Sequence, residues 1–254
     1  MLAKWTHPDR LVLPALGVAL TIFAWLAWSF RGYTPDDTYI FLRSAQNAAA
    51  GHGLVFNPQE RVYGNTSLPW AALLAAVTWA GLPALAVAKS LGVLLAGLTI
   101  VIAQRLALSI DTRAAIAAPL VMAGFLDLPY WGVSGMDTAL FTCLVAAALL
   151  ATARAPDGAP PHVAGLAWGL AAATRPEGVA LGLIALAWLL VRGRWTRRQV
   201  VTTISAFVIP IAAIALFALA YYGDILPNTY WAKRWGRVEA LHRGLIYMRA
   251  FVMA

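Results

Sequence analysis

Long apolar stretches are the feature of this sequence that most restricts how the chain folds. A helix needs about 20 apolar residues to cross a bilayer core about 30 Å thick, and residues 11–30, 84–108 and 200–222 each supply such a stretch. The chain is 61% hydrophobic and only 12% charged, which excludes an ordinary soluble domain of this length. The first stretch is too long and too rich in Trp for a signal peptide, so we expect it to be retained. These features predict an all-α integral membrane protein.

Shorter apolar blocks complete the expected bundle. They cover residues 114–129, 138–153, 163–173 and 179–191. With the longer stretches they predict about seven transmembrane helices, although the last two blocks reach only about 16–20 Å as helices. Residues 31–83 form a long first outer loop, and its apolar segment 67–80 is predicted to be a short helix at the membrane surface. The whole chain, residues 1–254, is interpreted as a single transmembrane module.

The basic residues predict the orientation. If the helices alternate, the Lys and Arg residues that flank them fall on one side: Lys4, Arg10, Arg105, Arg113, Arg154, Arg192, Arg194, Arg197 and Arg198. An excess of Lys and Arg marks the cytoplasmic side, so the N-terminus is predicted to be cytoplasmic and the C-terminus outside. The net charge of +8 is therefore explained by topology, and no nucleic-acid partner is expected. The single cysteine, Cys143, excludes an internal disulfide and a thiolate metal cluster.

The predicted topology collects polar residues at the outer membrane surface. They are Asp36, Asp37, Arg43, Lys89, Asp127, Asp137, Arg175, Glu177, Asp224, Asn228 and Lys233. Carboxylates and cations that face one interface suit a reaction between an anionic lipid headgroup and a hydroxyl that must be activated. This pattern indicates a membrane enzyme.

The acidic pair at the end of the first apolar stretch supports two hypotheses. In the local one, Thr34 is a helix N-cap, Asp37 completes a capping box, and both acidic residues oppose the helix dipole. In the functional one, Asp36 shares a helical face with Tyr39 and Arg43. The carboxylate then accepts a proton while the guanidinium holds a phosphate. The two hypotheses are compatible.

The segment 174–178 places charge between two short apolar blocks. Bare charges in lipid are costly, so Arg175 and Glu177 are predicted to line a cavity that is protected from lipid and open to the outside. Pairing of these two residues, or snorkelling of Arg175, is the structural alternative. Snorkelling also explains Lys89, and contact with lipid headgroups explains Lys233.

Several ordered motifs carry a family resemblance. They are DDTYIFLRSAQNAAAGHGLVFNPQERVYGNTSLPW at 36–70, SGMDTALF at 134–141, ATRPEG at 173–178 and YYGDILPNTY at 221–230. The first resembles the first outer loop of GT-C membrane glycosyltransferases, which use polyprenyl-phosphate sugars as donors. Within that family the chain is most similar to the actinobacterial arabinofuranosyltransferase-like group. The motifs are specific to the family and say little about the sugar: the resemblance suggests arabinofuranose, and mannose or another hexose stays open.

The resemblance implies an inverting sugar transfer at the outer face of the bacterial cytoplasmic membrane. Asp36 or Asp37 would be the general base on the acceptor hydroxyl of a glycan, a lipid or a protein. The residues implied to bind the donor phosphate are Arg175, Arg43, Lys89 and Lys233, and those implied to orient substrate are Tyr39, Asp137, Glu177 and Asn228. Some members of the family use a divalent cation, so the resemblance allows one here without implying it.

Two departures from the family and two alternative functions accompany this interpretation. Family members usually continue with more helices and often with an outer soluble domain, so a chain ending at Ala254 is interpreted as a fragment or a minimal seven-helix module. Asp137 stands where many relatives have Glu.

A lipid-linked-sugar transporter or flippase would be expected to show repeat-related halves, and no repeat is found in the sequence. A membrane scaffold would not need its charges on one side.

Overall fold

The computed structural model describes residues 9–193, 195–232 and 237–253, and every element in these residues is a helix. The helices are α1 (Asp9–Ser29), α2 (Asp36–Ala49), α3 (Leu68–Trp79), α4 (Ala84–Leu108), α5 (Thr112–Gly124), α6 (Asp127–Gly132), α7 (Thr138–Arg154), η1 (Ala155–Asp157), α8 (Pro161–Thr174), α9 (Glu177–Arg192), α10 (Arg197–Tyr222), α11 (Asn228–Ala232) and α12 (Arg237–Met253). The predicted all-α fold class is therefore confirmed for the described residues.

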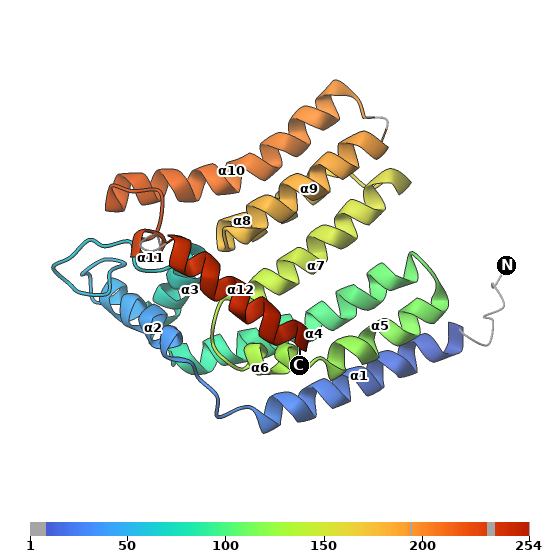
Figure 1. Cartoon of the computed structure of the whole chain (residues 1–254), viewed down its shortest axis with the longest axis horizontal. Helices are drawn as coiled ribbons and strands as arrows, with labels where there is room; N and C mark the ends of the chain where they lie inside the picture. The colour runs from blue at the N-terminus through green and yellow to red at the C-terminus, as the bar shows by residue number, and fades with distance from the viewer. Residues whose placement is uncertain (1–8, 194, 233–236, 254) are drawn as a thin grey trace.

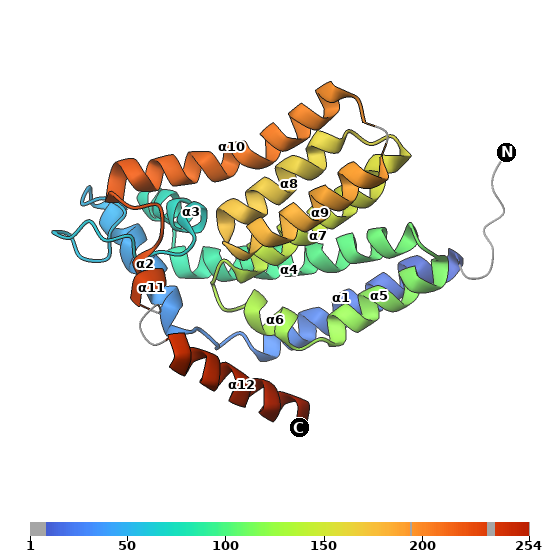
Figure 2. The ribbon, with the colours of Figure 1, turned by 45° about the horizontal axis from the view of Figure 1, so that its top comes forward.

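The helices of the bundle, long and short, lie side by side, and the chain runs along them in alternating directions (Figure 1, Figure 2). Neighbouring pairs are α1 with α5, α5 with α4, α4 with α7, and α7 with α8. The last long helix, α10, packs mainly on α8. Gly165 and Gly169 of α8 let the two backbones lie close together, because a Cβ at either position would collide with carbonyl oxygens of α10. Small residues at such crossings let membrane helices approach closely.

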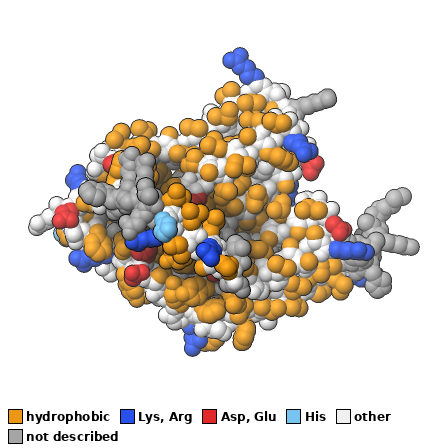
Figure 3. All heavy atoms as spheres, viewed as in Figure 1, with side chains coloured by type: hydrophobic (Ala, Val, Ile, Leu, Met, Phe, Trp, Pro, Cys, Tyr) orange, Lys and Arg blue, Asp and Glu red, His pale blue; other side chains and the backbone are white. Residues whose placement is uncertain are grey.

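Four helices in the described residues are long and apolar enough to cross a membrane: Arg10–Ser29, Ala84–Leu108, Thr138–Asp157 and Arg197–Tyr222. Large apolar side chains such as Ile184 and Leu216 are exposed on the outer faces of the bundle. Hydrophobic side chains are spread over the whole face in Figure 3, whereas charged side chains are few. Because water-soluble domains rarely expose such extended apolar surface, the fold is consistent with a helical membrane protein.

The shorter helices correct one sequence prediction and leave another open. The apolar block 114–129 is not one helix: α5 ends at Gly124 and α6 begins at Asp127. The helices α5, α8 and α9, with 13, 14 and 16 residues, are about 20–24 Å long. They lie alongside the longer helices in the bundle (Figure 1). Seven crossings remain a prediction.

One end of the bundle carries the long first loop. A short helix was predicted in 67–80, and the structure has one there, α3, which packs against α2. Its location at the membrane surface stays a prediction. Both helices lie at the same end as the loop 133–137 and the turn between α8 and α9 (Figure 1), and we call this the α2–α3 end. Its core contains Phe41 of α2, Trp70 and Leu74 of α3, and Met136. This core positions the candidate functional residues.

Candidate functional site

The acidic pair opens helix α2. Pro35, with φ −70° and ψ 157°, is the residue before the helix, and no side chain caps the first turn. The predicted capping box around Thr34 is therefore wrong, since the helix begins at Asp36. A carboxylate oxygen of Asp36, Oδ1, accepts a hydrogen bond from the backbone N–H of Asp37 at 3.0 Å. Both side chains are exposed at the positive end of the helix dipole, where negative charge is stabilised.

The buried face of α2 is tied to the loop before α7. The hydroxyl of Thr38 donates to the carbonyl of Ser134 at 3.0 Å, and Thr38 is fully buried. Gly135 has φ +82°, and a Cβ there would lie 3.0 Å from the Thr38 methyl group. On the other side of the loop, the indole N–H of Trp70 donates to the Gly135 carbonyl at 3.1 Å. Helices α2 and α3 therefore hold the SGMD motif beside the acidic pair.

An ion pair connects α7 to the turn between α8 and α9. The Nε and Nη2 atoms of Arg175 each donate to a carboxylate oxygen of Asp137 at 2.9 Å. Nη2 also donates to the Thr138 hydroxyl at 3.1 Å. The Asp137 side chain is 0% exposed and that of Arg175 27%, and the hydrogen bond to Asp137 raises the pKa of Arg175. The partner of Arg175 is thus Asp137, whereas Glu177 is exposed.

Lys89 anchors the linker that leads to the acidic pair. Its Nζ donates to the carbonyl of Arg31 at 3.0 Å and to that of Tyr33 at 2.7 Å. The Tyr33 ring stacks on Tyr130 of α6 with a centroid separation of 3.9 Å. A hydrogen bond between the two hydroxyls raises the pKa of Tyr33 to about 12. Lys89 does more than snorkel, because it fixes the backbone immediately before Asp36.

The last motif meets the first loop rather than the ion pair. The hydroxyl of Tyr222 donates to the carbonyl of Leu54 at 2.6 Å, and the backbone N–H of Leu54 donates to the Tyr221 hydroxyl at 3.1 Å. The backbone N–H of Asn228 donates to the carbonyl of Tyr63 at 2.7 Å. The Asn228 side chain is exposed and lines a pocket of about 330 Å³ with residues of the same loop.

The structure therefore groups some predicted site residues and separates others. Asp36, Asp37, Lys89, Asp137 and Arg175 lie at the α2–α3 end and are connected through the contacts above. The exposed residues Tyr39 and Arg43 follow on α2, and Arg43 is about 10 Å along the helix from Asp36. Lys233 lies outside the described residues.

Sequence reasoning missed the residues that hold the site together. They are Tyr33, Thr38, Trp70, Ser134 and Gly135. The last four lie inside the motifs given above, and membership of a motif was the feature of the sequence that could have identified them. Within the residues that the structure describes, no three His, Cys, Asp or Glu side chains are grouped so that they could hold a metal ion.

Comparison with known proteins relates the chain to two curated relatives. It is 31% identical over 248 residues to a terminal beta-(1→2)-arabinofuranosyltransferase of Mycobacterium tuberculosis, with 91% of this chain and 39% of that protein covered. It is 32% identical over 268 residues to a terminal beta-(1→2)-arabinofuranosyltransferase of Corynebacterium glutamicum, with 89% of this chain and 37% of that protein covered. The chain thus spans less than two fifths of the curated relatives it matches. No family model matches the chain, and no solved structure matches it significantly.

Proposed function

We propose that this chain is a GT-C membrane glycosyltransferase that moves arabinofuranose from a polyprenyl-phosphate donor to an acceptor hydroxyl. The observation that carries the proposal is the convergence of the Asp36–Asp37 pair with the Asp137–Arg175 ion pair through the contact of Thr38 with Ser134. Similarity over nine tenths of the chain to proteins named as arabinofuranosyltransferases supports the reaction class and the sugar.

The proposed reaction is a single inverting displacement. As the acceptor oxygen bonds to the anomeric carbon, its proton passes to the carboxylate of Asp36 or Asp37. The bond from that carbon to the phosphate oxygen breaks, and polyprenyl phosphate leaves with the electron pair. Cations near the phosphate stabilise the charge that develops there. One oxygen of Asp36 already accepts the Asp37 N–H, so the other oxygen of Asp36 or either oxygen of Asp37 is available for the proton.

The residues around the proposed base must be held in position, and the ion pair does this. Asp137 and Arg175 are positioning residues in this proposal, because they hold the loop that binds Thr38 of α2. Three N–H donors are assigned to contacts of Arg175 with Asp137 and Thr138. A guanidinium has five N–H donors, so Arg175 retains donors for a phosphate.

The α2–α3 end is proposed to face outward. Basic residues gather at the opposite end: Arg105 lies in the last turn of α4, Arg154 ends α7, Arg192 ends α9 and Arg197 begins α10. Because basic residues favour the cytoplasmic side, this distribution supports a cytoplasmic N-terminus and about seven crossings of the bacterial cytoplasmic membrane.

Cysteine labelling tests this orientation. In a Cys143→Ala background, which removes the single cysteine, a membrane-impermeant maleimide applied from outside should label Glu177→Cys and should not label Asp157→Cys. Both positions are exposed, and they lie at opposite ends of α8: Asp157 ends η1, which precedes that helix, and Glu177 begins α9, which follows it. Lysed cells, in which both should react, provide the control. Labelling of only Asp157→Cys in intact cells would reverse the proposed orientation.

A transfer assay tests the function. Membranes containing the chain are incubated with labelled polyprenyl-phosphate arabinofuranose, and with the mannose analogue as a comparison. We expect label to move to an acceptor from the arabinofuranose donor. Transfer from mannose alone would overturn the sugar, and no transfer from either donor by the folded chain would overturn the function.

A further inference from the structure

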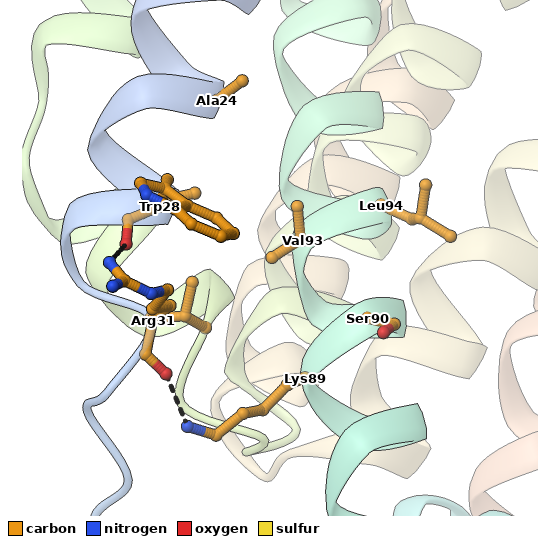
Figure 4. A pocket seen from close by; sticks show the side chains of 9 residues that line it. Ala24, Trp28, Arg31, Lys89, Ser90, Val93 and Leu94 are labelled. Carbon is orange, nitrogen blue, oxygen red and sulfur yellow. Dashed lines mark hydrogen bonds between the residues drawn. The ribbon is translucent and has the colours of Figure 1, made fainter.

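A groove of about 470 Å³ runs between α1 and α4. Its walls are apolar and include Ala24, Trp28, Val93 and Leu94, whereas Arg31 and Lys89 lie at one end (Figure 4). Both helices are long and apolar enough to cross a membrane. The groove therefore combines a lipid-like lining with a cationic end.

The two cations are held in place without a carboxylate partner. Arg31 Nη1 donates to the carbonyl of Trp28 at 2.9 Å, and the guanidinium lies 4.3 Å from the centre of the Trp28 ring. Lys89 donates to the carbonyls of Arg31 and Tyr33. In the described part of the chain, neither cation forms an ion pair with Asp or Glu. Their positive charge is therefore available to an anion.

The cationic end lies beside the acidic pair. Val133 lines the groove, and the next residue, Ser134, accepts the hydrogen bond from Thr38 near the start of α2. On the other side, Lys89 holds the carbonyl of Tyr33, three residues before Asp36. An anion bound at Arg31 and Lys89 would thus be next to the start of α2.

We propose that the α1–α4 groove is the donor site, in which the polyprenyl chain lies between the helices and its phosphate contacts Arg31 and Lys89. This inference rests on the proposed function and adds Arg31 to the predicted phosphate partners, with Arg31 and Lys89 rather than Arg175 as the main contacts. The buried carboxylate of Asp137 already neutralises Arg175. A guanidinium is well suited to a phosphate because it donates in a fixed fork.

Direct binding tests the groove independently of transfer. The chain is placed in nanodiscs of neutral phospholipid, and binding of a radiolabelled polyprenyl phosphate that carries no sugar is measured. We expect Arg31→Gln to weaken binding about tenfold, because one charge-assisted contact is lost. The matched control is Arg10→Gln, an exposed arginine at the N-terminal end of α1, whereas Arg31 follows its C-terminal end; this variant should bind as wild type.

A second pair of variants tests the apolar walls without touching the cations. Ala24→Trp fills the groove and should weaken binding of both polyprenyl phosphate and uncharged polyprenol. Ile22→Trp places the same side chain elsewhere on the exposed surface of α1 and should change neither.

The outcomes separate the two proposals. Equal binding by wild type and Arg31→Gln, or equally strong competition by phosphatidylglycerol, would overturn the donor-site assignment. Transfer that persists unchanged in Arg31→Gln and Ala24→Trp would also overturn it while the proposed function stands. Binding that depends on Arg31, with no transfer from any donor, would support the groove as a polyprenyl-phosphate site and contradict the proposed function.

Discussion

Replacing the proposed catalytic aspartate by asparagine is expected to reduce sugar transfer about 10²–10⁴-fold, because an amide cannot take up the proton of the acceptor hydroxyl. The candidates are Asp36→Asn and Asp37→Asn, and one of them should show the full loss. Both side chains are exposed at the start of α2, so the changes should leave the fold intact. The loss should appear in kcat, with the KM for the donor little changed.

A matched control distinguishes this loss from a general effect of charge. Asp157→Asn removes an exposed carboxylate from η1, which follows the C-terminal end of α7, and should retain wild-type transfer. Thermal unfolding of each purified variant checks that the fold is preserved. Wild-type rates in both the Asp36 and the Asp37 variant would exclude the pair as the base.

Replacing Asp137 by alanine is expected to destabilise the protein by about 2–4 kcal/mol. Removing one partner of a fully buried ion pair costs about 3–5 kcal/mol because the other charge is left uncompensated. The cost is smaller here, since the Arg175 side chain is 27% exposed and water can reach it. Unfolding in a denaturing detergent titration measures the change. Transfer should fall as well, because the loop that binds Thr38 loses its anchor.

A double-mutant cycle assigns this effect to the pair. In the Arg175→Met background, Asp137→Ala should lower the free energy of unfolding by less than it does in the wild type, because no unpaired guanidinium is left behind. Glu177→Gln, at an exposed carboxylate two residues from Arg175, should leave the free energy of unfolding nearly unchanged. Additive effects of the two changes would show that the ion pair does not stabilise the fold.

The apolar pattern predicted the long helices well and the breaks between helices poorly. Residues 84–108 were predicted as an apolar stretch and form α4 with the same bounds. The block 114–129 was predicted as one helix but is interrupted at Phe125, whose backbone is extended. In a lipid-facing protein the residues at such a break are also apolar, so hydropathy carries no signal for it.

Local signals placed the start of α2 only approximately. Thr34, Pro35 and Asp37 fit a capping box by spacing, yet Pro35 is extended and the helix begins at Asp36. Distant residues hold this region, since Lys89 binds the Tyr33 carbonyl and Ser134 binds Thr38. Their positions depend on how α4 and α7 pack, which the local sequence does not contain.

The sequence by itself determined the membrane-type composition, the long helices and the motifs in which the candidate catalytic residues lie. Only the tertiary structure decided the partners of the charged groups. Arg175 pairs with Asp137, 38 positions away, rather than with neighbouring Glu177, and Lys89 binds a carbonyl 56 positions away. The physical reason is that a charge between membrane helices needs a partner that satisfies it. The packing of the helices selects that partner, and spacing along the chain does not.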